Sequence, residues 1–258
     1  MLSYYKTENG RMLQLQACEP GCWINCVSPD DREINSLISD FGIEADFFRA
    51  AMDEEESSHI DHEGENTLIV IDIPIVEKEG RNITYTTMPF GIIITEKNVI
   101  TVSIKDNPVV EEFAQGGVRG VQTNLKTRFM LSFMLRVATR FLQYLKQIDK
   151  ISNYVETELR RSMRNAELNQ LLDIEKSLVY FSSSLKGNEI TLEKIMRGRV
   201  VKLYDDDEDL LEDVLIEVKQ AIDMSNIYLI KTLYNAILRQ NIRILNNSLN
   251  VKNNTCFC

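Results

Sequence analysis

A dense run of acidic residues in the last third of the chain is the first candidate for chemistry. It consists of Asp205, Asp206, Asp207, Glu208, Asp209, Glu212, Asp213 and Glu217. Carboxylate oxygens are hard ligands of the kind that calcium and magnesium ions accept. The run also stands at the predicted start of a helix, where negative charge suits the helix dipole without any ligand. It therefore indicates either a charged helix start or a weak surface for divalent cations or a partner.

The two histidines bracket an acid in the segment Ser-His-Ile-Asp-His-Glu, as His59, Asp61 and His62. Imidazole and carboxylate together can bind one metal ion. On an extended strand, however, His59 and Asp61 share one face while His62 points to the other. A solvated strand edge is the favoured interpretation, with a metal site as the alternative.

The cysteines have no spacing typical of a zinc ribbon or finger. Cys18, Cys22 and Cys26 recur every four residues, and Cys256 and Cys258 end the chain. We interpret them as ordinary buried or incidental thiols.

No sequence motif indicates an enzyme. The segment Gly116–Gly120 lacks the Lys-Ser/Thr ending of a phosphate loop and is predicted to be a turn. Two histidines in one segment leave little capacity for a general base, and no nucleophile, base and orienting acid can be recognised together.

Composition restricts the partners and the compartment. The 39 acidic residues outnumber the 29 basic ones, giving a net charge of -10, which argues against nucleic acid and favours cations. Met1–Gly10 is polar and lacks the apolar core of a signal peptide, so five cysteines indicate a reducing, cytosolic location. The longest apolar run, Leu68–Val76, contains Asp72 and Pro74 and is too short to span a membrane.

Short strands and helices should fill the first half of the chain. Ser28 is predicted to cap a helix with Pro29 at its first position and Gly42 at its end, followed by a short helix over Ala45–Met52. The predicted strands are Ser3–Thr7, Met12–Gln16, Trp23–Val27, Thr67–Val76, Asn82–Ile94 with a break near Pro89-Phe90-Gly91, and Asn98–Ile104.

Long helices should fill the second half. Apolar residues recur at steps of three and four over Thr123–Met163 and again over Ala166–Leu185, which predicts an antiparallel helical hairpin. A shorter helix is expected over Ile190–Arg199. The last helix, from about Asp206 to Asn250, would be about 65 Å long, so part of it must leave the domain and pack against something else, most simply copies of itself. Its later half carries Lys231, Arg239, Arg243 and Lys252, which suit either a helix C-terminus or the cytoplasmic side of a membrane.

Three segments, read in this order of elements, resemble the CorA family of divalent-cation transporters. Ala51-Met52-Asp53-Glu54-Glu55-Glu56-Ser57-Ser58-His59-Ile60, with the strand from Thr67 to Pro74, is similar to an acidic turn and strand of that family. Asp205–Tyr228 resembles the start of its stalk helix, and Asn246–Val251 the segment before its first membrane helix.

The resemblance implies an α+β fold: an α/β/α sandwich with a mixed central sheet, a helical hairpin and a long C-terminal stalk helix. Residues 1–200 would form the cytoplasmic sensor domain, 201–251 the stalk and 252–258 a tail outside the family. The family forms homopentamers whose cytoplasmic domain and stalk form a funnel at the cytoplasmic face of the cell membrane, and magnesium bound between neighbouring subunits holds the pore shut. The two membrane helices and the Gly-Met-Asn signature of the family do not follow Val251, so we expect no conduction by this chain. In the family these missing helices make the contact with the membrane, and we expect no other membrane contact.

The resemblance also implies a regulatory metal, Mg with Co or Zn as alternatives, held by facing carboxylates. Candidates for these ligands are Glu77, Glu79, Asp205, Asp206, Asp209 and Asp213. The leading hypothesis is the regulatory and assembly domain of a magnesium or cobalt channel. A zinc-transporting relative and a soluble coiled-coil scaffold without metal are the alternatives.

Overall fold

A seven-stranded mixed sheet forms the centre of the molecule. The computed structural model describes residues 1–79, 82–162, 165–198 and 200–255. The strand order is β2-β1-β3-β7-β6-β5-β4, in which β3 and β7 run parallel and every other neighbouring pair is antiparallel. The strands are β1 (Leu2–Glu8), β2 (Arg11–Leu15), β3 (Trp23–Val27), β4 (His59–Glu63), β5 (Asn66–Glu79), β6 (Asn82–Ile94) and β7 (Val99–Ser103).

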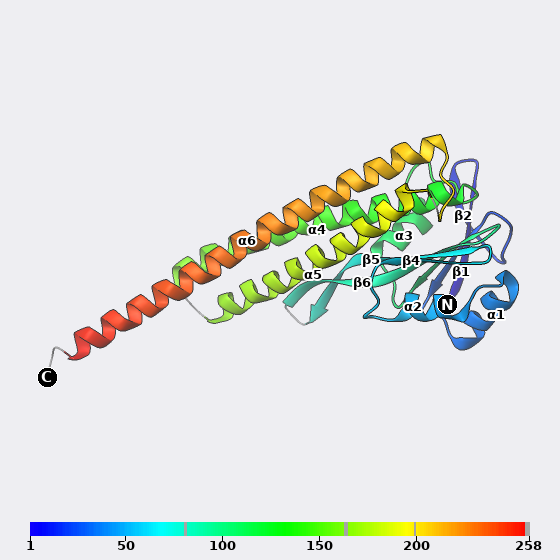
Figure 1. Ribbon diagram of the computed structural model, residues 1–258. Coiled ribbons are helices and arrows are strands. Elements are labelled where there is room, and N and C mark those ends of the chain that lie inside the picture. The colour runs from blue at the N-terminus through cyan, green and yellow to red at the C-terminus, as the bar shows by residue number, and fades with distance from the viewer. Residues whose placement is uncertain (80–81, 163–164, 199, 256–258) are drawn as a thin grey trace.

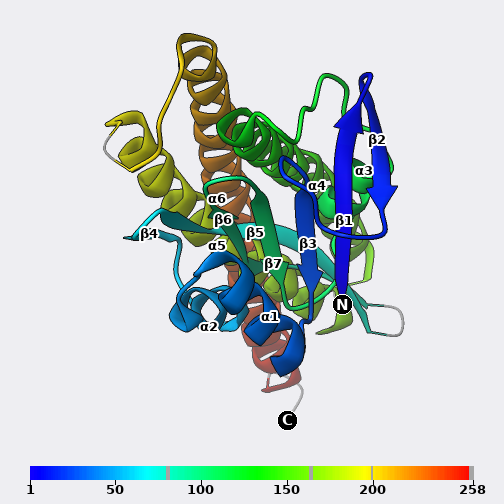
Figure 2. The same ribbon diagram turned by 90° about the vertical axis from the view of Figure 1, so that its right-hand side faces the viewer.

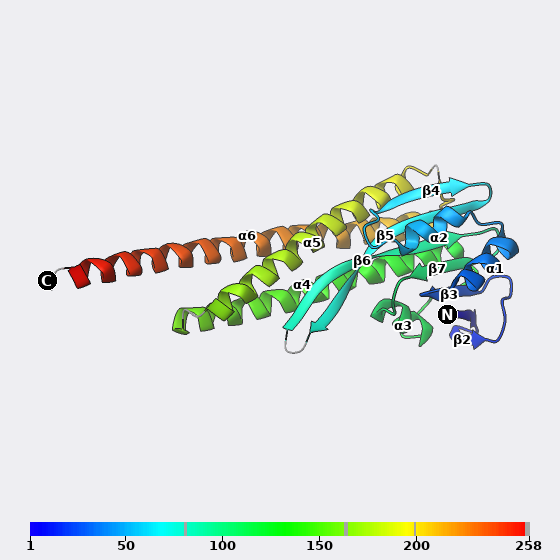
Figure 3. The same ribbon diagram turned by 90° about the horizontal axis from the view of Figure 1, so that it is seen from below.

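Helices cover both faces of this sheet, which confirms the predicted α/β/α layers. The helices α1 (Asp31–Phe41) and α2 (Ala45–Met52) pack on one face (Figure 2). The helices α3 (Pro108–Ala114), α4 (Lys126–Ser162) and α5 (Asn165–Met196) pack on the other, and α6 (Asp205–Thr255) lies along α4 and α5. The antiparallel α4–α5 hairpin and the projecting β5–β6 hairpin point the same way as the C-terminal end of α6 (Figure 3).

The start of α1 differs from the prediction by two residues. Asp30, not Ser28, is the N-cap: its side chain accepts the backbone N–H groups of Arg32 and Glu33, and the Glu33 side chain accepts the N–H of Asp30. Ser28 instead has a φ of 44° and turns the chain out of β3. The reciprocal Asp30–Glu33 pair satisfies more of the free N–H groups than a serine two residues earlier would. Gly42 ends the helix in the left-handed conformation, as predicted.

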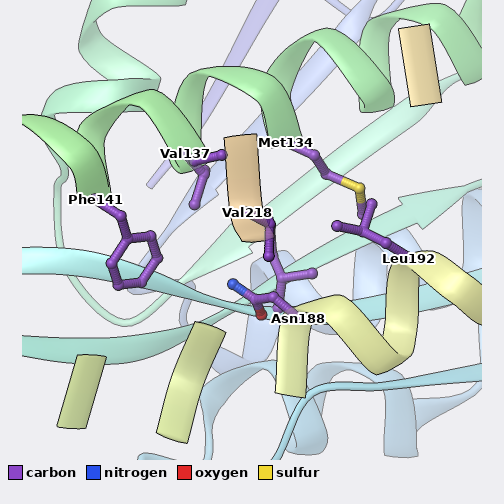
Figure 4. Close-up of a pocket in the computed structure, with 8 residues that line it drawn as sticks. Met134, Val137, Phe141, Asn188, Leu192 and Val218 are labelled. Carbon is purple, nitrogen blue, oxygen red and sulfur yellow. The ribbon is translucent and has the colours of Figure 1, made fainter. Parts of the chain in front are cut away.

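The predicted break in β6 near Pro89 does not occur. Pro89 pairs with Asp72 of β5, and the N–H and C=O of Asp72 bond to the side-chain amide of Asn188 at 2.8 Å each. The missing N–H of the proline therefore falls where the ladder does not need a donor. Asn188 extends from α5 into an otherwise apolar pocket between α4, α5, α6 and β5 (Figure 4). It closes the edge of β5 beyond the end of β4.

The helix expected over Ile190–Arg199 is instead the continuation of α5 through Gly187 to Met196. A glycine inside a helix usually lowers stability and suggests an end. Here a Cβ on Gly187 would lie 3.1 Å from Oγ and 3.3 Å from Cβ of Ser58, so the glycine lets α5 pass close to the segment before β4. Tertiary packing keeps the helix continuous.

The long C-terminal helix leaves the domain, as its length required. Its 51 residues correspond to about 75 Å. The first half of α6 buries Leu211, Val214, Val218 and Ala221 against the α4–α5 hairpin, whereas the second half extends beyond it (Figure 1). Lys231, near the end of the packed part, bonds to Asp149 and Asn153 of α4 at 2.7 Å each.

One close contact between α2 and the sheet gives a direct test of this packing. A Cβ on Gly91 of β6 would lie only 2.5 Å from Cβ of Ala51, so Gly91→Ala should destabilise the protein by about 1–3 kcal/mol in urea unfolding. Ala51→Gly alone should cost about 1 kcal/mol because glycine weakens a helix. In the double variant the new methyl group occupies the space of the old one. The double variant should therefore be about as stable as Ala51→Gly, and strictly additive losses would contradict the contact.

Candidate metal centre

The acidic run occupies the first turns of α6, next to the end of α5. Asp207 is the exception in the run because its side chain is buried and accepts the backbone N–H of Tyr204 at 3.3 Å. It therefore holds the start of the helix. Asp205, Asp206, Asp209 and Asp213 are exposed. At about 100° per residue these four carboxylates fall within roughly 100° of the helix circumference, so they share one face.

The basic side chains of Lys126, Arg128 and Lys202 line the same hollow as Asp206. Asp206 lies 3.8 Å from a guanidinium nitrogen of Arg128 of α4, but its side chain is 91% exposed, so the ion pair is weak. Several carboxylates on one exposed helical face repel each other, and a cation or a basic partner surface would relieve the repulsion.

The other two predicted ligands lie at the opposite end of the domain. Glu77 is exposed near the end of β5, and its carboxylate already pairs with Lys105 at 2.9 Å. Glu79 ends β5, and its side chain lies outside the described part of the molecule. The β5–β6 hairpin points away from the start of α6 in both Figure 1 and Figure 3. One chain therefore does not bring Glu77 and the α6 acids together.

The histidine segment forms β4, one of the two edge strands of the sheet, as favoured from the sequence. Nδ1 of His59 bonds to the carbonyl oxygen of Ser57 at 2.8 Å, and Nε2 lies 3.4 Å from the carboxylate of Asp61. His62 points the other way and bonds to Thr67. The alternative of a shared metal site for the two histidines is not supported. Over the described residues, no group of three or more His, Cys, Asp or Glu side chains is arranged to hold a metal ion.

An apolar stripe on α6 was not recognised in the sequence. The residues Ile216, Ile227, Ile230, Tyr234 and Ile237 are exposed, and their angular positions overlap those of Asp205 and Asp209. Leu211, Leu215 and Val218 lie on the opposite face, which packs on α4 and α5. The steps of three, four and three from Ile227 to Ile237 were the available signal. One face of α6 is thus acidic at its start and apolar further along.

Helix hydropathy adds one further finding. No helix within the described ranges is both long enough and apolar enough to cross a membrane.

Comparison with known proteins identifies the family. Residues 19–251 match the model of the CorA-like Mg2+ transporter protein family. A curated relative, the cobalt/magnesium transport protein CorA of Methanocaldococcus jannaschii, is 26% identical over 215 residues. The match covers 80% of this chain but 65% of that relative, so the chain spans less than two thirds of its length.

Solved structures share the fold. The complete CorA magnesium transporter of Methanocaldococcus jannaschii has a TM-score of 0.87 at 18% identity, covering 99% of this chain and 81% of that one. Its soluble domain scores 0.80 at 20% identity, covering 92% and 95%. The ZntB cytoplasmic domain of Vibrio parahaemolyticus scores 0.71 at 13% identity, covering 95% and 97%. At these identities the likenesses establish the fold alone.

The layered sheet, the helical hairpin and the projecting helix form the fold that these solved structures share. The chain belongs to the CorA-like Mg2+ transporter family.

Proposed function

We propose that this chain forms the cytoplasmic regulatory and assembly part of a CorA-type channel-transporter for magnesium or cobalt. In this proposal residues 1–200 form the sensor domain, 201–251 the stalk and 252–258 a tail outside the family, and the unit assembles as a homopentamer at the cytoplasmic face of a membrane. The observation that carries it is α6, a helix of 51 residues that extends beyond its own domain with an exposed apolar face. Such a face is typical of a helix that packs against other copies.

The acids at the start of α6 are the proposed regulatory ligands. Asp205, Asp206, Asp209 and Asp213 would meet acids of a neighbouring subunit, with Glu77 and Glu79 as further candidates. Glu77 ranks below the α6 acids because Lys105 already neutralises it. A Mg2+ ion binds through one or two carboxylates and keeps several of its waters, which suits exposed acids and weak binding. Bound ions would hold subunits together, and their loss would let the like charges separate them.

Magnesium should therefore stabilise the assembly. Millimolar Mg2+ is expected to raise the melting temperature or the oligomer content relative to chelator, because an ion that binds only the assembled state shifts the equilibrium towards it. The measurements are thermal melting and sedimentation velocity at constant ionic strength, set with potassium chloride. Asp209→Asn with Asp213→Asn should abolish the response.

The matched control removes the same number of charges elsewhere. Asp31 of α1 and Glu44 before α2 are exposed acids on the other face of the sheet from α6, and the variant Asp31→Asn with Glu44→Gln should respond to Mg2+ like the original chain. Identical melting and sedimentation in magnesium and chelator would refute the proposed regulation. A response that survives the Asp209 and Asp213 substitutions would place the ion elsewhere.

A further inference from the structure

Two thiols lie in contact on the loop between β2 and β3. The Sγ atoms of Cys18 and Cys22 are 3.8 Å apart; Cys18 is exposed, whereas Cys22 is buried. The side-chain amide of Asn98, from the β6–β7 turn, donates to the carbonyl oxygens of Glu19 at 2.8 Å and Cys22 at 3.0 Å, and to Sγ of Cys22 at 3.2 Å. Tertiary contacts therefore fix the loop and place Sγ of Cys22.

The sulfur separation suits a shared metal ion. Zinc–sulfur bonds are about 2.3 Å long, so two sulfurs on a tetrahedral zinc ion lie about 3.8 Å apart. A disulfide would need the sulfurs to approach to about 2.05 Å. The observed separation of 3.8 Å equals that of two sulfurs on one zinc ion, whereas a disulfide would require the thiols to move together.

The electrostatic surroundings favour a cation. The negative charges of Asp40 and Glu19 act on Cys18. The same negative groups attract a cation, and an ion that coordinates a thiol deprotonates it outright. The N–H of Asn98 directed at Cys22 is the kind of supporting hydrogen bond that stabilises a metal ligand.

We propose that Cys18 and Cys22 form a two-thiolate site for a soft divalent cation of the Zn2+ or Cd2+ type. The site lies on the β2–β3 loop and is independent of the acids on α6. Because no third ligand joins the two thiols among the described residues, water would complete the coordination. Thiolates select soft ions, whereas Mg2+ prefers oxygen ligands, so magnesium should not compete.

Cadmium is the probe, because cadmium–thiolate bonds give an ultraviolet charge-transfer band. The titration uses the full chain with a phosphine reductant and with Cys256→Ser and Cys258→Ser, which remove the second thiol pair. We expect one ion per chain. Cys18→Ser should weaken binding at least about tenfold, and it suits the test because Cys18 is exposed. Cys26→Ala removes a buried thiol outside the pair and should leave the band unchanged.

The proton balance gives a second readout. Each ion displaces the protons of both thiols, so a pH indicator should record two protons per ion, and the apparent affinity should rise by up to about 100-fold per pH unit. Binding that survives Cys18→Ser, or a band that excess Mg2+ displaces, would overturn the proposal. These outcomes differ from a failed magnesium response on α6, which leaves the thiol site untouched.

Discussion

Replacing Glu112 with alanine should destabilise the protein by about 2 kcal/mol, because the change leaves two arginines half-buried without their shared partner. Glu112 of α3 accepts hydrogen bonds from Nε and Nη2 of Arg136 and from Nη2 of Arg140, both on α4. Its side chain is 21% exposed, so water screens these bonds only in part. This cluster joins the short α3 to the hairpin that supports α6. Urea unfolding measures the loss, with the same slope of unfolding free energy against urea concentration fitted for both proteins.

The pH dependence of Glu112→Gln separates charge from packing. The hydrogen bond from Arg136 lowers the pKa of Glu112 below its ordinary value, and the charges of both arginines act in the same direction. A depressed folded-state pKa stabilises the protein fully above the unfolded pKa of about 4.3, and this contribution is lost as the pH falls through the folded value. The stability difference between the original chain and Glu112→Gln should thus be constant above about pH 5 and shrink below pH 4.

Arg140→Met is the matched control for the Glu112 cluster. Arg136 still pairs with Glu112 through two hydrogen bonds in this variant, and the substitution also removes Nε of Arg140, a buried donor with no partner among the described groups. The loss should stay below about 1 kcal/mol. An Arg140→Met loss equal to that of Glu112→Ala would mean that both changes act through packing.

The sequence predicted those elements whose signals are local. The helix over Ala45–Met52 is correct to the residue, and the capping glycine Gly42 also stands where expected. The α4–α5 hairpin followed from an apolar repeat that long helices display openly. The Glu112 cluster was not predictable in this way. Its carboxylate and arginines are 24 and 28 residues apart, and only the packing of α3 on α4 brings them together.

Two of the errors have one physical cause, which is that tertiary contacts replaced local propensities. Pro89 and Gly187 each suggest a break when read alone, but Asn188 satisfies the backbone opposite Pro89, and Ser58 occupies the space beside Gly187. The candidate metal ligands show the same limit. Composition identified the acids on α6, but the facing acids that we propose would belong to a second copy, and neither propensity nor periodicity within one chain describes such a geometry.

Replacing Ile227 and Ile230 together with glutamate should convert the assembled protein to monomers. These side chains are 61% and 68% exposed, and with Tyr234 and Ile237 they form an apolar stripe with the three-four spacing of a helix–helix contact. Two carboxylates per chain would bring like charges into each contact between copies and remove its apolar area. Sedimentation velocity in millimolar Mg2+ should show the oligomer for the original chain and the monomer for the variant.

The exposure of these side chains keeps assembly separate from folding. Because Ile227 and Ile230 are not part of the protomer core, their substitution should change the unfolding free energy of the monomer by no more than about 0.5 kcal/mol. Val179→Glu with Tyr180→Glu is the matched control, since it adds the same charges at exposed apolar positions of α5. If both double variants lose assembly, the added surface charge prevents association wherever it is placed, and the α6 stripe has no special part in the contact. If the α6 variant still forms the oligomer, α6 does not hold the copies together and the proposed assembly role of the stalk is wrong.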